Sequence, residues 1–388
     1  MLGRVMVKGR YLRFSCCFVC LIILTSNLWT MRKWTERTGV YDDLCYLTQA
    51  HLFQRFGVGG FDTDIARDDD QFLATLERDI GYPLWNEPKS AVCHNPMIAT
   101  SKIVIQYPPG TGFLLALFPS GFQRVPLYAA ANFIIFFVAL SAIWFARTTQ
   151  AVVRSVALGG LALYFMINPA KASFSIAPSL AVCALTGYLM VVMFTAKNQR
   201  SRFIATTMTG FLLGLSVNFR LPNLFLATGP FLWLAVEAFR TRKTNAVLPM
   251  IVFGTVYLAG LAPTLVANAI NAGSPFSTTY GPDDTVLDLS FAIAKKYIFD
   301  MQGALIVVAL AWAAWSLRSA TRNPVPSVVI ANLVCSLLIF LSHPLFNPYY
   351  LMPIAMLSLW CLLFNDISNG RPLSRGASIN FKPQPLRS

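Results

Sequence analysis

The sequence predicts an all-α polytopic membrane protein with about ten transmembrane helices and a large first outer loop. The chain is 55% hydrophobic and 12% charged, whereas soluble domains carry roughly 25% charged residues. Long apolar runs recur from residue 14 to residue 364. The net charge of +14 fits the excess of Lys and Arg in cytoplasmic loops better than it fits a nucleic-acid binder, so no nucleic-acid partner is expected.

The N-terminal segment imitates a secretory signal peptide, because basic residues precede an apolar run. The run from Phe14 to Trp29 lacks a small-x-small cleavage site, and Trp29 ends it as interfacial anchors do. We therefore interpret this segment as an uncleaved first span.

Ten apolar runs, the first span included, define the expected topology. The spans are expected at residues 14–30, 125–146, 152–168, 176–196, 203–219, 222–239, 247–268, 301–317, 325–342 and 348–364. The stretch 107–122 is shorter than the roughly 20 residues that a span needs, and Pro and Gly interrupt it. We therefore expect residues 107–120 to form a helix at the outer interface.

Loop charge sets the expected orientation. With ten spans the basic clusters fall on the cytoplasmic side together with both termini, and an eleventh span would move three of them outside. The expected organisation is one domain, 1–364, with outer loops 31–124 and 269–300, followed by a disordered cytoplasmic tail, 365–388. We expect an integral protein of the bacterial inner (plasma) membrane with its active site on the outer face.

Acidic residues gather in the two outer loops. Eleven of the 17 fall in residues 31–106 and four more in 269–300. Two interpretations stand: these loops are the water-exposed segments with room for charge, or they hold a polar site. Cys45 and Cys93 are the two cysteines in outer loops, and they either form a disulfide or remain free thiols.

The segment "DDLCYLTQAHLFQRFG" predicts a short helix with Asp42 or Asp43 at its N-cap. A single Asp satisfies the capping role, so two in a row leave one carboxylate free. A helix N-terminus favours the ionised form, which suits a general base or a cation ligand.

Four other outer segments carry candidate residues, each with a structural alternative. Tyr107 precedes a Pro-Pro turn that also serves as a helix start. Arg220 lies in a hairpin, where it either contacts lipid phosphate or binds a ligand phosphate. The remaining candidates are Asp283 and Asp284 in "NAGSPFSTTYGPDD", and His343, Tyr349 and Tyr350 in "SHPLFNPYYLMP", where the tyrosines also suit an aromatic belt.

The sequence lacks the motifs of several common nucleotide-binding and metal-binding sites. The sequence has no P-loop, GxGxxG or HExxH motif, and it has no pair of CxxC motifs. With three histidines, a zinc site is not expected, and the run 61–72 does not match the oxygen spacing of an EF-hand. We therefore predict no metal site.

The ordered set "YDDLCY", "YPPGTGF", "FRLPN", "AGSPFSTTYG" and "NPYYLMP" resembles the GT-C superfamily of membrane glycosyltransferases. The similarity is greatest to the branch with protein O-mannosyltransferases and aminoarabinose (lipid-A) transferases, and it covers about residues 13 to 364. Tyr107 stands where several relatives have Lys, and Asn347 and Pro348 stand where a basic residue is common. The large soluble domain that follows the spans in several branches is missing here.

The resemblance implies transfer of a sugar from a polyprenyl-phosphate donor to a glycan, lipid or protein by one inverting displacement. Asp42 would accept the proton of the acceptor hydroxyl, and Asp43 would orient or bind the acceptor. Donor phosphate and lipid would contact Arg220, Tyr107, His343, Tyr349 and Tyr350. The acceptor or sugar would contact Tyr46, Lys102, Asp283 and Asp284. No cofactor is expected, although some members use a divalent cation such as Mg or Mn.

Two other functions compete with this one. A transporter or flippase of lipid-linked saccharides often shows internal repeats and broken spans, and the halves of this chain show no repeat. A polysaccharide polymerase or ligase is expected to have its large loop late in the chain, whereas here the largest loop comes first. A non-catalytic scaffold would not need the Asp pair.

Overall fold

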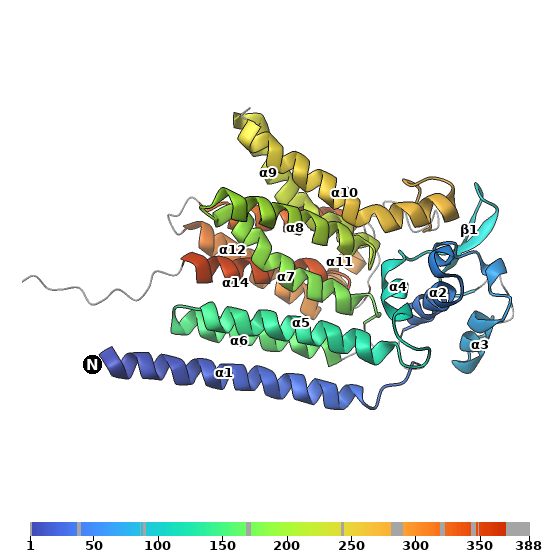
Figure 1. Ribbon diagram of the computed structural model, residues 1–388, viewed down its shortest axis with the longest axis horizontal. Coiled ribbons are helices and arrows are strands. Elements are labelled where there is room, and N and C mark those ends of the chain that lie inside the picture. Colours follow the sequence, from blue (N-terminus) through green and yellow to red (C-terminus); the bar gives the residue numbers. More distant parts are fainter. Residues whose placement is uncertain are drawn as a thin grey trace, which may run out of the picture.

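A computed structural model gives the structure of the protein. It describes residues 2–36, 40–85, 87, 91–167, 172–241, 244–280, 290–318, 323–342, 347 and 349–369. Long helices run side by side in a bundle, and a smaller cap lies at one end of it (Figure 1). The cap comprises the described part of residues 40–123. The beginning of the first helix lies at the opposite end of the bundle from the cap (Figure 1), so the first helix runs the length of the bundle.

The bundle is built from apolar helices. They are α1 (Leu2–Met31), α5 (Arg124–Phe145), α6 (Thr149–Tyr164), α7 (Ile176–Thr195), α8 (Gln199–Val217), α9 (Thr228–Thr241), α10 (Thr244–Ala272), α12 (Met301–Arg318), α13 (Val325–Ser342) and α14 (Met352–Asn369), with the 3-10 turns η4 (Phe165–Ile167) and η5 (Leu221–Ala227) and the short helix α11 (Phe291–Ile298) between them. Within the described residues, 8 helical segments are long and apolar enough to cross a membrane. The protein is therefore an all-α membrane protein.

Those eight segments overlap eight of the ten expected spans. They are Arg10–Met31, Arg124–Phe145, Thr149–Ile167, Ile176–Thr195, Leu221–Thr241, Val247–Ala272, Met301–Arg318 and Val325–Ser342. The other two expected spans correspond to α8 and α14. The residues of α14 from Met352 to Phe364 are all buried, because α14 packs against α6, α7, α12 and α13. The count of ten spans stays a prediction.

The cap consists of short helices and strands that follow one another along the first large loop. They are α2 (Asp42–Phe56), η1 (Gly57–Phe61), η2 (Ile65–Arg67), α3 (Phe72–Asp79), β1 (His94–Met97), β2 (Lys102–Ile105) and α4 (Gly110–Ala116). The two strands pair antiparallel, with His94 opposite Ile105 and Met97 opposite Lys102. A disulfide joins Cys45 of α2 to Cys93 just before β1, with their Cα atoms 6.4 Å apart. The bond fixes this hairpin to α2.

The helix expected over residues 107–120 is much shorter in the structure. Only Gly110–Ala116 is helical. Pro108 and Pro109 lack N–H groups and have fixed φ angles, so the chain enters the helix only after them. The chain turns again at Gly121, whose φ of 81° is readily available only to glycine.

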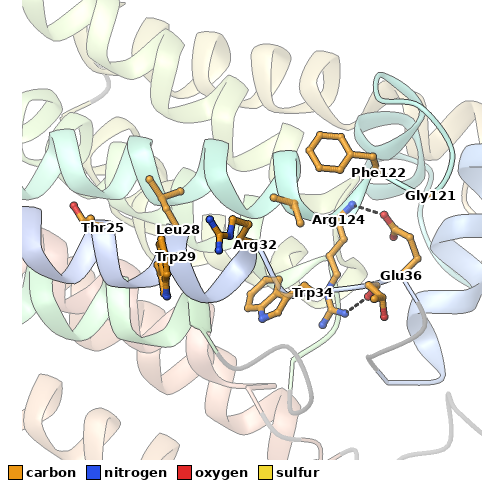
Figure 2. Close-up of a pocket in the computed structure, with 11 residues that line it drawn as sticks. Thr25, Leu28, Trp29, Arg32, Trp34, Glu36, Gly121, Phe122 and Arg124 are labelled. Atoms are coloured by element: carbon orange, nitrogen blue, oxygen red, sulfur yellow. Dashed lines mark hydrogen bonds between the residues drawn. The ribbon is translucent and has the colours of Figure 1, made fainter.

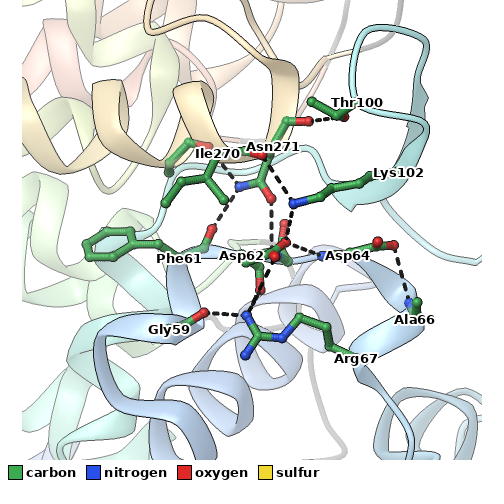
Figure 3. A network of polar contacts seen from close by, with 12 residues as sticks. Gly59, Phe61, Asp62, Asp64, Ala66, Arg67, Thr100, Lys102, Ile270 and Asn271 are labelled. Carbon is green, nitrogen blue, oxygen red and sulfur yellow. Dashed lines mark hydrogen bonds and ion pairs between the residues drawn. The ribbon is translucent and has the colours of Figure 1, made fainter.

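A polar network anchors the cap to the end of α10 (Figure 3). The Nζ of Lys102 lies 3.0 Å from an Asp62 carboxylate oxygen and donates to the carbonyl of Ile270 at 3.3 Å. The side chain of Asn271 accepts from the backbone N–H of Thr63 at 3.0 Å and donates to the carbonyl of Phe61 at 2.8 Å. Main-chain groups of the cap are therefore satisfied by a bundle helix.

The contact between α8 and α10 depends on glycine. A Cβ on Gly214 would lie 2.1 Å from the carbonyl oxygen of Tyr257, and one on Gly260 would lie 2.4 Å from that of Phe211. Gly210 and Gly214 have the four-residue spacing that lets helices approach closely in a membrane. The two backbones are therefore in direct contact.

Asn218, just after α8, bonds into the backbone of α10. Its Oδ1 accepts from the N–H of Thr264 at 2.9 Å, and its Nδ2 donates to the carbonyl of Gly260 at 2.7 Å. In a regular helix those two backbone groups bond to each other. Pro263 lies beside them inside the helix, where a proline disturbs this ladder. The Asn218 amide therefore bridges an interrupted turn and fixes the end of α8.

We predict that Gly214→Ala lowers the free energy of unfolding by about 1–3 kcal/mol, because the added methyl group must push α8 away from α10. Gly254→Ala is the matched control, since its Cβ would meet nothing closer than a Phe231 ring atom at 3.9 Å. Thermal unfolding in detergent measures both. Equal melting temperatures for the two variants would contradict the close contact.

Candidate functional site

A cavity of about 360 Å³ lies where the cap meets the bundle. Its lining residues are Asp42, Tyr46, Gln106, Tyr107, Ser173, Arg220, Leu221, Pro222, Leu224, Phe225, Thr278, Tyr280, Ile339, Phe340, Asn347 and Tyr350. Each of the five outer segments singled out in the sequence contributes to this lining. Segments more than 300 residues apart in the chain therefore surround one space.

The two adjacent carboxylates have different surroundings at this cavity. Asp42 lines it, whereas Asp43 is 2% exposed. The carboxylate of Asp43 accepts from the backbone N–H groups of Phe174 at 2.8 Å and of Val40 at 3.2 Å. Burial raises the pKa of Asp43, and these two N–H groups and the nearby charge of Arg124 oppose the rise. Asp43 therefore joins the cap to the segment that precedes α7.

The prediction that one of the two carboxylates is the N-cap is wrong. The helix begins at Asp42, and the N-cap position is Tyr41, which makes no side-chain capping bond. Both carboxylates lie in the first turn instead. The Asp43 carboxylate accepts from the N–H of Val40, which precedes the helix. Acidic side chains in the first turn are still favoured by the helix dipole.

Tyrosine rings form one wall of the cavity. The rings of Tyr46 and Tyr107 stack with centroids 5.1 Å apart, and the Tyr280 ring meets Tyr107 edge-on at 6.2 Å. Burial raises the pKa of all three phenols, and the charge of Asp42 adds to the rise. The wall therefore offers neutral hydroxyl groups and flat aromatic faces beside a carboxylate.

Arg220 supplies a cation to the same cavity. Its Nη1 donates to the carbonyl of Tyr349 at 3.3 Å, and its guanidinium carbon lies 5.4 Å from the centre of the Tyr350 ring. The Tyr349 side chain itself is buried and packs edge-on against Phe165, with centroids 5.9 Å apart. Tyr349 therefore holds Arg220 through its backbone, and its ring does not line the cavity.

A close backbone approach brings Tyr107 and Arg220 together. The N–H of Gly110 donates to the carbonyl of Asn218 at 2.7 Å. A Cβ on Gly110 would lie 2.7 Å from Asn218, and one on Gly112 would lie 2.5 Å from Gln49. The glycines of "YPPGTGF" therefore let α4 pack between α2 and the hairpin that carries Arg220.

Helices α11 and α12 hold the last segment of the cavity in place. Gln302 of α12 donates to the carbonyl of Asn347 at 3.3 Å and accepts from the N–H of Leu351 at 2.7 Å. The hydroxyl of Tyr297 in α11 accepts from the N–H of Asn347 at 3.2 Å. The backbone around Tyr350 is thus fixed from both sides.

The opposite wall of the cavity is apolar. It is formed by Phe225 and its neighbours in η5 and by Ile339 and Phe340 at the end of α13. Phe340 lies edge-on to Tyr350 with centroids 4.9 Å apart, and Phe225 lies 6.4 Å from Phe340. Since η5 and α13 belong to two of the apolar membrane segments, this apolar part of the lining comes from the bundle.

Sequence reasoning missed several lining residues, and it assigned to the site Asp43, Lys102 and Tyr349, which do not line the cavity. Tyr280 lies inside a quoted motif and Gln106 directly precedes "YPPGTGF", so these positions were the available signal, whereas nothing pointed to Ser173. Lys102 belongs to the network at the end of α10 and does not line the cavity (Figure 3). His343, Asp283 and Asp284 lie outside the described residues.

Within the part of the chain that the structure describes, no three His, Cys, Asp or Glu side chains gather into a group suited to a metal ion. Comparison with protein-family models gives no match, and comparison with curated proteins gives none either.

The buried tyrosines predict a loss of stability at high pH. Their folded-state pKa values lie above the ordinary value of about 10, so the stability they contribute is complete below pH 10 and falls as pH rises further, at about 1.4 kcal/mol per pH unit for each group. We expect the Tyr107→Phe variant to lose less stability above pH 10 than the wild type, by the contribution of one tyrosine. Melting temperatures between pH 9 and 11 test it, with the exposed Tyr41→Phe as control. A slope in Tyr107→Phe equal to that of the wild type would contradict the burial of its phenol.

Proposed function

We propose that the protein is a GT-C-type glycosyltransferase that transfers a sugar from a polyprenyl-phosphate donor to an acceptor hydroxyl group. The observation that supports this most is the cavity in which Asp42 and Arg220 line one space with an aromatic wall and an apolar side. A carboxylate and a guanidinium are the two charges that an inverting transfer from a phosphate leaving group needs.

Asp42 is the proposed base. Its carboxylate accepts the proton of the acceptor hydroxyl while the acceptor oxygen forms a bond to the anomeric carbon. The bond between that carbon and the phosphate oxygen breaks, and polyprenyl phosphate leaves with the electron pair. A positioned base accelerates such a step by about 10²–10⁴-fold.

Arg220 is the proposed contact for the phosphate. Its Nη1 bond to the Tyr349 carbonyl uses one of five donors, so the guanidinium retains donors for phosphate oxygens. The charge that develops on the leaving phosphate is stabilised by a donor already held in place. Tyr107 and Tyr350 offer hydroxyl groups and ring faces to the sugar and phosphate.

Asp43 and Tyr349 act by positioning in this proposal. Asp43 bonds to the backbone of Val40 and Phe174, so it fixes the first turn of α2 that carries Asp42. Tyr349 fixes Arg220 through its carbonyl. The apolar wall from η5 and α13 would receive the first isoprene units of the donor.

The location of the reaction belongs to the same proposal. Ten spans, with α8 and α14 added to the eight, put both termini in the cytoplasm and the cap on the outer face of a bacterial inner membrane. A lipid-linked donor suits that face, because nucleotide sugars are absent outside the inner membrane.

Reconstituted protein supplied with polyprenyl-phosphate sugars and candidate acceptors, with and without Mg²⁺ or Mn²⁺, tests the chemistry. We expect Asp42→Asn to lower kcat by about 10²–10⁴-fold and Arg220→Gln by about 10²–10³-fold. Asp69→Asn is the matched control, because Asp69 is an exposed cap carboxylate that pairs with Arg55 and does not line the cavity. Full turnover by a folded Asp42→Asn protein would overturn the assignment of the base.

Cysteine labelling in intact cells tests the orientation. Val58 lies in the cap and is 85% exposed, so a membrane-impermeant maleimide is expected to label the Val58→Cys variant. Lys197 follows α7, whose 20 residues span about 30 Å. The Lys197→Cys variant is therefore expected to react only after the cells are opened. The reverse pattern would refute the outer location of the cap.

A further inference from the structure

A second cavity, which we call the interfacial pocket, lies beside the end of α1. It has a volume of about 500 Å³ and is separate in its lining residues from the cavity of Asp42. Its walls come from the last turns of α1, the segment that follows it and the start of α5 (Figure 2). None of the functions proposed above uses it.

Arg124 and Glu36 are polar lining residues of this pocket, and hydrogen bonds hold both in place. Arg124 is fully buried, and its Nη1 donates to the carbonyl of Thr35 at 2.7 Å. The Oε1 of Glu36 accepts from the backbone N–H group of Gln123 at 2.6 Å. It also accepts from the backbone N–H group of Arg124 at 3.0 Å (Figure 2). The charge of Arg124 also interacts with the carboxylates of Asp43 and Glu36. These two acidic groups compensate the Arg124 charge.

Arg32 is the second cation that lines the pocket, and it is exposed. Its guanidinium carbon lies 4.2 Å from the centre of the Trp29 ring, where the ring face favours a cation. Among the ion pairs of the described residues, none includes Arg32. The pocket therefore presents one positive charge that no carboxylate of the described chain balances.

The rest of the pocket is apolar and open toward the sides of two membrane helices. It is formed by Leu28 and Trp29 of α1 and by Phe122, which precedes α5 (Figure 2). Val125 of α5 also lines it. Trp29 is 61% exposed and Phe122 56% exposed. Further along the same helices Phe18 and Phe137 are exposed as well, so both helices carry exposed apolar side chains beyond the pocket.

We infer that the interfacial pocket binds an anionic membrane phospholipid. The lipid phosphate lies against the guanidinium of Arg32, which provides a fork of donors suited to phosphate oxygens. An acyl chain lies against Leu28 and Val125 and continues along α1 and α5. Trp29 and Trp34 stand at the height of the head group, where tryptophan is enriched in membrane proteins.

The shape of the pocket selects a lipid over a free phosphate ion. A soluble phosphate would contact Arg32 alone and leave the apolar walls in water, whereas a lipid covers them and gains about 25 cal/mol for each Å² of apolar surface buried. The uncompensated charge of Arg32 selects an anionic head group over a zwitterionic one, whose ammonium group would gain nothing from that cation.

Native mass spectrometry of the detergent-purified full chain, titrated with phosphatidylglycerol, tests this inference. We expect one tightly retained lipid. Arg32→Gln is expected to weaken its binding about tenfold or more, since a hydrogen bond to a charged group is worth about 1.5–3 kcal/mol. Lys33→Gln is the matched control, because it removes the same charge from the next residue, which is exposed and lies outside the pocket lining. It is expected to change binding less than about threefold.

Parallel titrations distinguish the possible ligands. Phosphatidylethanolamine is expected to bind more weakly than phosphatidylglycerol, and glycerol 1-phosphate and dioleoylglycerol, which each lack one half of the lipid, are expected not to be retained. Equal lipid binding by wild type and Arg32→Gln would overturn the inference. Retention of glycerol 1-phosphate as tight as that of the lipid would replace it with a soluble phosphate site. Since the readout is binding, it does not depend on the proposed transferase activity.

Discussion

The close approach of Gly110 to Asn218 is the contact on which the arrangement of the cavity depends. The backbone bond of 2.7 Å between them requires a residue without a side chain at position 110, because a Cβ would overlap Asn218. Asn218 is in turn fixed by its bonds to the interrupted turn of α10. One polar residue thus joins α8, α10 and the cap, and it holds Arg220, two residues later, opposite Tyr107.

The two adjacent carboxylates show how burial divides neighbouring residues of one type. Successive positions in a helix point about 100° apart, so Asp42 and Asp43 cannot face the same space. Asp43 is directed into the protein, where two backbone N–H groups meet its carboxylate. Asp42 is directed into the cavity. The side chain that fixes the turn is therefore not the one that faces the cavity.

Asp43 and Arg124 link elements that line the two cavities. Arg124 lines the interfacial pocket, and its charge reaches Asp43, which is bonded to Phe174. This charge interaction connects the beginning of α5 to the first turn of α2. A lipid bound beside Arg32 would therefore lie next to the elements that position Asp42, although it would not contact Asp42 itself.

The sequence by itself determined the class of the protein and the set of segments that meet. Apolar runs predict spans because a helix must satisfy its own backbone in lipid, and motif order singled out the five segments that supply most of the cavity lining. Only the tertiary structure decided which side chains of those segments face the cavity. It turned the ring of Tyr349 toward Phe165 and placed Lys102 at the end of α10. It also brought in Ser173, Phe225 and Phe340. Side-chain direction depends on where helices cross and where glycine allows backbones to touch, and these are contacts between residues far apart in the chain.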